Sequence, residues 1–156
     1  MENVMIVAAY VYNRYRDEYQ ARIDKMKLHK LMYFAQRESL IQRDEPLFDA
    51  VFYGWKYGPV LKVIREVYDR DMFMKEVPND VKDRVEPVMD KVFREYAGKS
   101  SWSLSRLTHG ELSWKNSRIG IPPDANSDNP ILLEDIRKDA ERIRERRQMR
   151  VMLGLA

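Results

Sequence analysis

The sequence predicts a mainly α-helical fold: a compact single-domain bundle of six or seven helices with one short extended segment near residues 49–56. Apolar residues recur at helical spacing along most of the chain, and only this segment shows the two-residue alternation of a strand. The length of 156 residues suits one domain. A content of 44% hydrophobic and 34% charged residues is typical of a folded, soluble protein.

The first two helices are predicted from regularly spaced apolar residues. Valines three to four positions apart mark the first helix, at Val4, Val7 and Val11. The second helix has one apolar face, formed by Leu28, Leu31, Met32 and Ala35. Asp24 is the expected N-cap of this helix, because its carboxylate can accept hydrogen bonds from the free amides of the first turn.

The extended segment ends in the stretch GWKYGPV, residues 54–60. We expect Gly58 to supply an unusual backbone angle or a close approach, and Pro59 to lie in the first turn of the third helix. Trp55 and Tyr57 then fill the junction between this turn and the second helix. The alternative is that Tyr57 or Lys56 lies at a binding interface, where exposed aromatic residues often dominate affinity.

The third and fourth helices are also predicted from apolar spacing. The third has its apolar face at Val60, Val63, Ile64 and Val67. The fourth begins after Pro78, ends at Gly98, and has its apolar face at Val81, Val85, Val88, Val92 and Tyr96. Pro87 either kinks this helix or lies in the first turn of a shorter one.

A short helix, a loop and a final helix complete the predicted bundle. The short helix covers residues 101–108, with Ser100 or Ser101 as its cap. Residues 119–130 contain three prolines among Asp, Asn and Ser, which predicts a loop. The last helix begins near Ile131, and its apolar face is formed by Leu133, Ile136, Ala140 and Ile143.

Positive charge is concentrated at the C-terminal end. The chain has a net charge of +3, whereas five arginines and one glutamate between residues 142 and 156 give a local +4, so the rest sums to −1. The apolar face fades over the same turns, so these arginines are expected to meet solvent or another protein. The rest of the chain is not basic, which argues against the alternative of a nucleic-acid-binding protein.

Several classes of chemistry are not expected. The absence of cysteine removes disulfides and cysteine-based zinc sites, and suits a reducing cytoplasm. No phosphate-binding or dinucleotide glycine pattern occurs, and the two histidines stand far apart, so we expect no cofactor and no metal. The apolar run near the N-terminus is too short to span a membrane.

One enzymatic alternative stays open. Ser105 and His109 are four residues apart, so one helix face could bring a nucleophile and a base together in a small hydrolase. No glycine-framed turn surrounds the serine, and no third orienting group can be identified. The residues therefore favour a protein that is not an enzyme, with His109 as a helix-ending residue whose ring hydrogen-bonds locally.

Three stretches together resemble the Panacea antitoxin domain, first catalogued as a phage-associated domain. They are KLHKLMYFAQRESL at 27–40, PLFDAVFYGWKYGPV at 46–60 and LTHGELSW at 107–114. The matching motif residues in the last two include Trp55, Tyr57, Gly58, Pro59, Thr108, His109 and Trp114. The resemblance implies a helical domain over residues 1–120, followed at 121–156 by a loop and a basic helix that packs on it or extends from it.

The resemblance also implies a function. Proteins of this family are antitoxins of two-gene toxin–antitoxin operons, and they neutralise toxins by direct protein contact. Their toxins are of unrelated kinds, small alarmone-synthetase-like toxins among them. The expected partner is therefore a cognate protein toxin in a hetero-oligomer, and nucleic acid is not the expected partner, because this chain shows no added DNA-binding domain.

Three surfaces are candidates for the toxin interface. The first is the turn at Lys56. The second is the run of apolar residues Met72, Phe73 and Met74, which cannot all face inward at a helix end. Methionine also suits surfaces that repack against different partners. The third is the basic end of the last helix, at Arg142, Arg146, Arg147 and Arg150.

Overall fold

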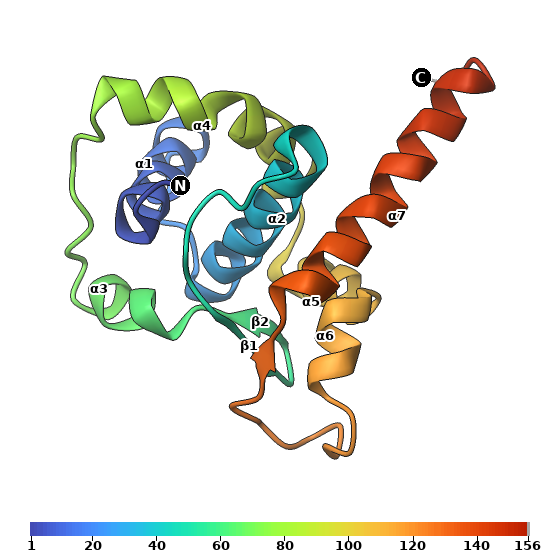
Figure 1. The fold of residues 1–156 in the computed structure, drawn as a ribbon. Helices are drawn as coiled ribbons and strands as arrows, with labels where there is room; N and C mark the ends of the chain where they lie inside the picture. Colours follow the sequence, from blue (N-terminus) through green and yellow to red (C-terminus); the bar gives the residue numbers. More distant parts are fainter. Residues whose placement is uncertain (156) are drawn as a thin grey trace.

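A central helix, α2 (Lys25–Arg43), organises the fold, and the other elements surround it (Figure 1). The computed structural model describes residues 1–155. These residues form seven α-helices and a three-stranded sheet, which confirms the predicted helical bundle. The remaining elements are α1 (Val4–Tyr19), β1 (Phe52–Trp55), β2 (Gly58–Val60), α3 (Arg65–Asp69), α4 (Asn79–Val92), α5 (Ser101–His109), α6 (Leu112–Ser117), β3 (Pro130–Ile131) and α7 (Leu133–Met152).

The apolar spacing of helix α2 predicted burial of one face only, but the helix is buried on all sides. Every residue from Lys27 to Ile41 is buried, including several charged ones. Asp24 caps the helix as expected, accepting a hydrogen bond from the amide of Lys27 at 2.8 Å. Burial of polar groups is tolerated where partners are present. Gln36, for example, donates to the carbonyl of Phe48 and accepts from the amide of Leu47.

A β-hairpin stands where the third helix was expected to begin. Strands β1 and β2 pair antiparallel with Trp55 opposite Gly58, so Lys56 and Tyr57 form a two-residue turn. Strand β3 adds to the other edge of β1. Pro59 therefore lies in a strand and not in a helical first turn, and helical structure begins only at a 3-10 turn, Lys62–Ile64, that leads into α3.

Pro87 lies in the interior of α4, which excludes the shorter helix that would place it in a first turn. Helix α4 begins at Asn79, and its predicted valines are buried. A π-helical segment, Phe93–Ala97, continues it and is followed by Gly98, close to the predicted end. The wider π turn fits a helix in which the missing amide of proline has already disturbed the hydrogen-bond ladder.

Helix α7 packs on α2 and α6. Asp139 of α7 accepts hydrogen bonds from the amides of Leu112 and Ser113, at 2.8 and 2.9 Å, and so caps α6. Arg144 donates to the carbonyls of Leu40 and Ile41 near the end of α2. The last turns of α7 extend beyond the rest of the molecule (Figure 1).

Candidate functional site

The hairpin turn and α5 together present an exposed aromatic pair. Tyr57 is 46% exposed and Trp102 is 59% exposed, and their rings meet edge to face with centroids 5.2 Å apart. Tyr57 therefore does not fill the junction behind the turn, which corrects the expected packing role. Two large aromatic side chains exposed in contact with each other are unusual on the surface of a monomer. We call Lys56, Tyr57, Trp102 and Arg106 the hairpin face.

A pocket of about 530 Å³ opens beside this aromatic pair. Its lining includes the four residues of the hairpin face together with Ser105 and His109. His109 ends α5 as expected, and its ring stacks on Trp114 with centroids 4.0 Å apart. Burial, followed by the charge of Lys30, lowers the pKa of His109, while hydrogen bonding with the backbone of Lys56 acts in the opposite direction.

Ser105 and His109 do not form a catalytic pair. The hydroxyl of Ser105 donates to the carbonyl of Tyr57 at 2.7 Å, which ties α5 to the hairpin turn. The Nε2 atom of His109 is buried and has no hydrogen-bond partner within residues 1–155. A nucleophile–base pair needs a hydrogen bond between the two side chains. This geometry gives no support to the hydrolase alternative.

Gly58 and Thr108 fix the underside of the hairpin. Gly58 has a φ of +116°, and a Cβ atom there would lie 2.5 Å from Cε of Lys30 and 2.7 Å from Oγ1 of Thr108. Both expected reasons for glycine, the backbone angle and the close approach, are therefore present. Thr108 is fully buried and donates to the carbonyl of Ser105 at 2.7 Å.

Two further motif aromatics connect the hairpin to α6. Trp114 donates from its indole nitrogen to the carbonyl of Trp55 at 2.8 Å. Trp55 itself is half-buried, and the guanidinium of Arg65 lies over it at 4.8 Å from the ring centroid. These contacts hold the turn rigidly between α3, α5 and α6.

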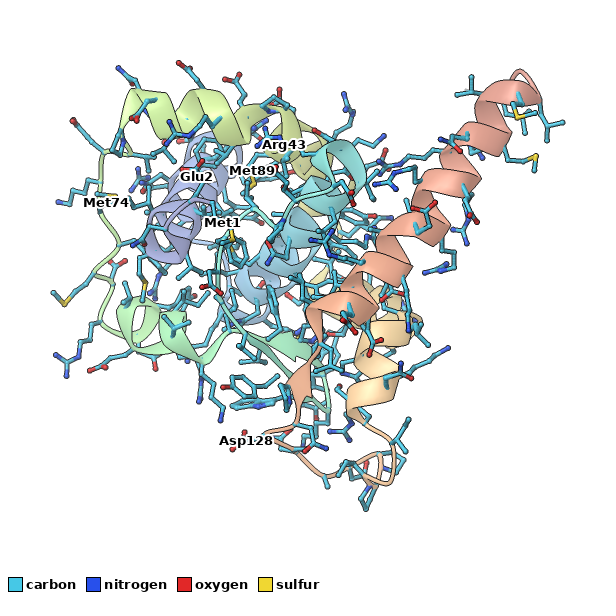
Figure 2. The ribbon with its side chains drawn as sticks, in the orientation of Figure 1. Met1, Glu2, Arg43, Met74, Met89 and Asp128 are labelled. Carbon is cyan, nitrogen blue, oxygen red and sulfur yellow. The ribbon has the colours of Figure 1, made fainter. Side chains whose placement is uncertain are left out.

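The second predicted surface, at Met72, Phe73 and Met74, is only partly exposed. Met72 and Met74 are exposed, whereas Phe73 is buried against Tyr12 with ring centroids 5.0 Å apart. Phe73 is therefore a core residue and not available for an interface. Met74 lies on the connection between α3 and α4, far from Asp128 near the hairpin end of the molecule (Figure 2).

The third predicted surface, the basic end of α7, is divided. Arg147 forms a two-pronged ion pair with Glu38 of α2, at 2.7 and 2.9 Å, and Arg142 pairs with Glu111 at 3.3 Å. Arg147 is half-buried against its own domain, contrary to the expectation that it meets solvent or another protein, whereas Arg142, Arg146 and Arg150 are exposed as expected. Beyond them the apolar side chains of the last turns are exposed, namely Met149, Val151, Met152, Leu153 and Leu155.

A buried ion pair joins α2 to the start of α6. Arg37 donates to Glu111 and, at 2.6 Å, to the hydroxyl of Tyr96. Burial raises the pKa of Glu111 to about 6 in spite of the guanidinium of Arg37. Within residues 1–155 no group of acidic residues and histidines is arranged to hold a metal ion. No helix in the same range is long and apolar enough to cross a membrane.

Two residues of this region were missed at the level of sequence. The residues one helical turn after Trp102 are Ser105 and Arg106, which are polar. Trp102 therefore has no apolar neighbour on that side of the helix. This pattern could have indicated that its side chain is exposed. Lys30 lies among the apolar residues of α2, but a lysine between core positions usually reaches solvent.

Comparison with known proteins agrees with the resemblance seen in the sequence. The family described as "Antitoxin SocA-like, Panacea domain" matches residues 28–115, more than half of the chain. These residues run from α2 to α6 and include the hairpin. "Antitoxin SocA" from Caulobacter vibrioides (strain NA1000 / CB15N) is 24% identical over 116 residues. The aligned part covers 69% of this chain and 62% of that relative. No solved structure matches the chain.

Proposed function

The chain belongs to the SocA-like Panacea-domain family of antitoxins, and we propose that it neutralises a cognate protein toxin by direct binding, as the antitoxin of a type II pair. The chain spans about three-fifths of the length of the curated relative it matches, so the activity of the relative is carried over as a proposal. In this proposal the protein acts by contact, and the hydrogen bond of Ser105 to the hairpin gives no support to the hydrolase alternative.

The exposed pair of Tyr57 and Trp102 is the observation that supports this proposal most directly. Aromatic residues are enriched among the few interface residues that carry most of the binding energy. Hydrogen bonds from Ser105 and Trp114 to the carbonyls of Tyr57 and Trp55 hold the backbone of the hairpin turn, so little backbone entropy is lost there when a partner binds. We therefore place the centre of the toxin interface on the hairpin face, which includes the predicted residue Lys56.

The partner is sought as the protein encoded beside this chain. Its expression alone should stop growth, and co-expression of this chain should restore growth. The purified proteins should form a complex in size-exclusion chromatography and calorimetry. Normal growth with the neighbouring protein alone, or failure of this chain to bind it, would exclude the proposed function.

Paired substitutions locate the interface. Replacing both Tyr57 and Trp102 by alanine should weaken toxin binding by about 30-fold or more, because the loss of one hot-spot residue already costs about 2 kcal/mol and the losses at two residues in contact need not add. The melting temperature should change little, since both side chains are exposed. Met72→Ala with Met74→Ala is the matched control, because it removes two exposed apolar side chains from another surface. Stronger loss of binding in the methionine variant would move the interface to that surface.

A further inference from the structure

Lys30 is a buried cation that contacts no acceptor directly. The residue is 1% exposed, yet within residues 1–155 its ammonium forms no hydrogen bond and no ion pair, and the carboxylate of Asp24 acts on it only through space. The other buried charged residues of α2 are all matched. Lys27 donates to the carbonyl of Ala97 at 3.0 Å, Arg37 pairs with Glu111, and Glu38 pairs with Arg147.

Lys30 lines a pocket of about 320 Å³ behind the hairpin turn. Four basic residues line this pocket, and none of its lining residues is acidic. The basic residues are Lys25, Lys30, Lys56 and Arg65. Trp55 and Tyr57 add aromatic walls. We call this the lysine pocket. It is distinct from the pocket beside Trp102, but Lys56 and Tyr57 border both.

The lysine pocket carries an excess of positive charge. Within residues 1–155, Lys25 is the only one of the four that forms an ion pair, with Asp69 at 2.5 Å, and the same carboxylate acts on Arg65 through space. Lys56 and Arg65 instead lie over the rings of Tyr57 and Trp55, at 5.1 and 4.8 Å from the centroids. His29, on the same wall, has its pKa lowered to about 3, first by burial and then by the charges of Lys30, Arg65 and Lys25. An anion would be stabilised here.

Folding alone gives no reason for this arrangement. A buried charge without a partner destabilises a protein, and a methionine of similar shape would pack in the same place without that cost. The hairpin is nevertheless built around the lysine, because a Cβ atom on Gly58 would collide with its Cε atom. A buried charged residue in the lining of an open pocket is a feature of binding sites.

We propose that the lysine pocket accepts an aspartate or glutamate side chain of the toxin, whose carboxylate forms an ion pair with Lys30. This inference rests on the proposed function. The pocket shares Lys56 and Tyr57 with the hairpin face, so a chain that covers Tyr57 and Trp102 can insert a side chain there. A carboxylate on an apolar stem also suits aromatic walls better than a free phosphate ion, which has no apolar part for them to contact.

The test compares Lys30→Met with Lys25→Met, which removes a lysine of the same pocket that already has a partner. Lys30→Met should weaken binding to the purified toxin by about 30-fold or more, as expected when one member of a buried interfacial charge pair is removed. Its melting temperature should equal or exceed that of the parent protein. Lys25→Met should change affinity less than fivefold. Equal affinity of Lys30→Met and parent would overturn the inference while leaving the proposed function intact.

The acidic partner residue is then found by replacing each surface Asp and Glu of the toxin with Asn or Gln. One such variant should lose the same affinity as Lys30→Met, with no further loss when the two are combined. If the loss of affinity in every acidic toxin variant adds to the loss caused by Lys30→Met, no toxin carboxylate pairs with Lys30, and the inference is wrong. Inorganic phosphate is the second probe. Phosphate could raise the melting temperature of the parent protein and not that of Lys30→Met, while Lys30→Met binds the toxin as the parent does. These two results together would show that the occupant of the lysine pocket is a free anion and not a toxin side chain. If the parent protein binds no toxin, both proposals fall.

Discussion

Lys30 makes the stability of the fold depend on pH over a defined range. Burial lowers the pKa of its ammonium to about 8, whereas the unfolded chain keeps the ordinary value near 10.4. Below pH 8 both states are charged, and the cost of burying the charge is constant. Between pH 8 and about 10.4 the folded protein loses the proton first, so the unfolded state binds more protons and stability rises with pH.

We therefore predict that Lys30→Met is more stable than the parent at pH 7, by about 3 kcal/mol, and that the difference falls below about 1 kcal/mol at pH 10. Urea unfolding of both proteins at several pH values measures this directly. Lys25→Met controls for the general loss of a positive charge. A difference that stays constant from pH 7 to 10 would mean that Lys30 has an ordinary pKa and reaches solvent.

Single residues also show what the sequence could not reveal. Asp24 and Ser100 were predictable as caps because the hydrogen bonds they accept are local. The burial of Lys30 depends on the hairpin passing over α2, a contact between segments about thirty residues apart. The spacing of Ser105 and His109 also does not reveal that the serine hydroxyl donates a hydrogen bond to the carbonyl of Tyr57 in the hairpin.

At the scale of elements, the hairpin depends on Gly58. Alanine at this position must adopt a φ of +116° and must displace Lys30 or Thr108, whose atoms lie within 2.7 Å of the new Cβ. Gly120 provides a matched control, since it has a φ of +80° but no atom within 4 Å of an added Cβ. It therefore reports the backbone cost alone.

We predict that Gly58→Ala destabilises the protein by about 3 kcal/mol or more and that Gly120→Ala costs only about 1 kcal/mol. Thermal or urea unfolding of the two variants gives the comparison. The difference in destabilisation between Gly58→Ala and Gly120→Ala measures the cost of the steric contact with Lys30 and Thr108. Equal losses at the two glycines would show that the side chains move aside freely and that the hairpin does not depend on close packing.

Helices with long apolar periodicity were predicted well, whereas among the short elements only α5 and the extended segment at β1 were predicted. The helices α1, α2, α4 and α7 each have 14 or more residues, and apolar spacing revealed all four. Residues Val60 to Val67 match the same spacing, but they divide into a strand, a 3-10 turn and a five-residue helix. The turn Lys56–Tyr57 lacks the Asn-Gly or Asp-Gly pair that would have signalled a hairpin. Helix α6, with six residues, is too short for periodicity to indicate.

At the scale of the whole molecule, α7 closes the domain. Its Arg147 neutralises Glu38, which is buried in α2, and its Arg144 satisfies carbonyls at the end of the same helix. From the local charge of this segment, its arginines were expected to meet solvent or another protein. The arginines that face α2 are instead needed by the core, because each buried acceptor must be matched.

Two truncations separate these roles. Deleting residues 142–156 should lower the free energy of unfolding by about 3 kcal/mol or more, since it leaves Glu38 as a buried carboxylate without a cation. Deleting only residues 149–156 keeps Arg144 and Arg147. The apolar side chains that this deletion removes within residues 1–155 are exposed, namely Met149, Val151, Met152, Leu153 and Leu155. This shorter deletion should change the melting temperature little, and it is the one that can test whether the end of α7 contacts the toxin. Full retention of toxin affinity by the shorter truncation would restrict the interface to the hairpin face. Full stability of the longer truncation would show instead that α7 is an appendage and that Glu38 is matched by water.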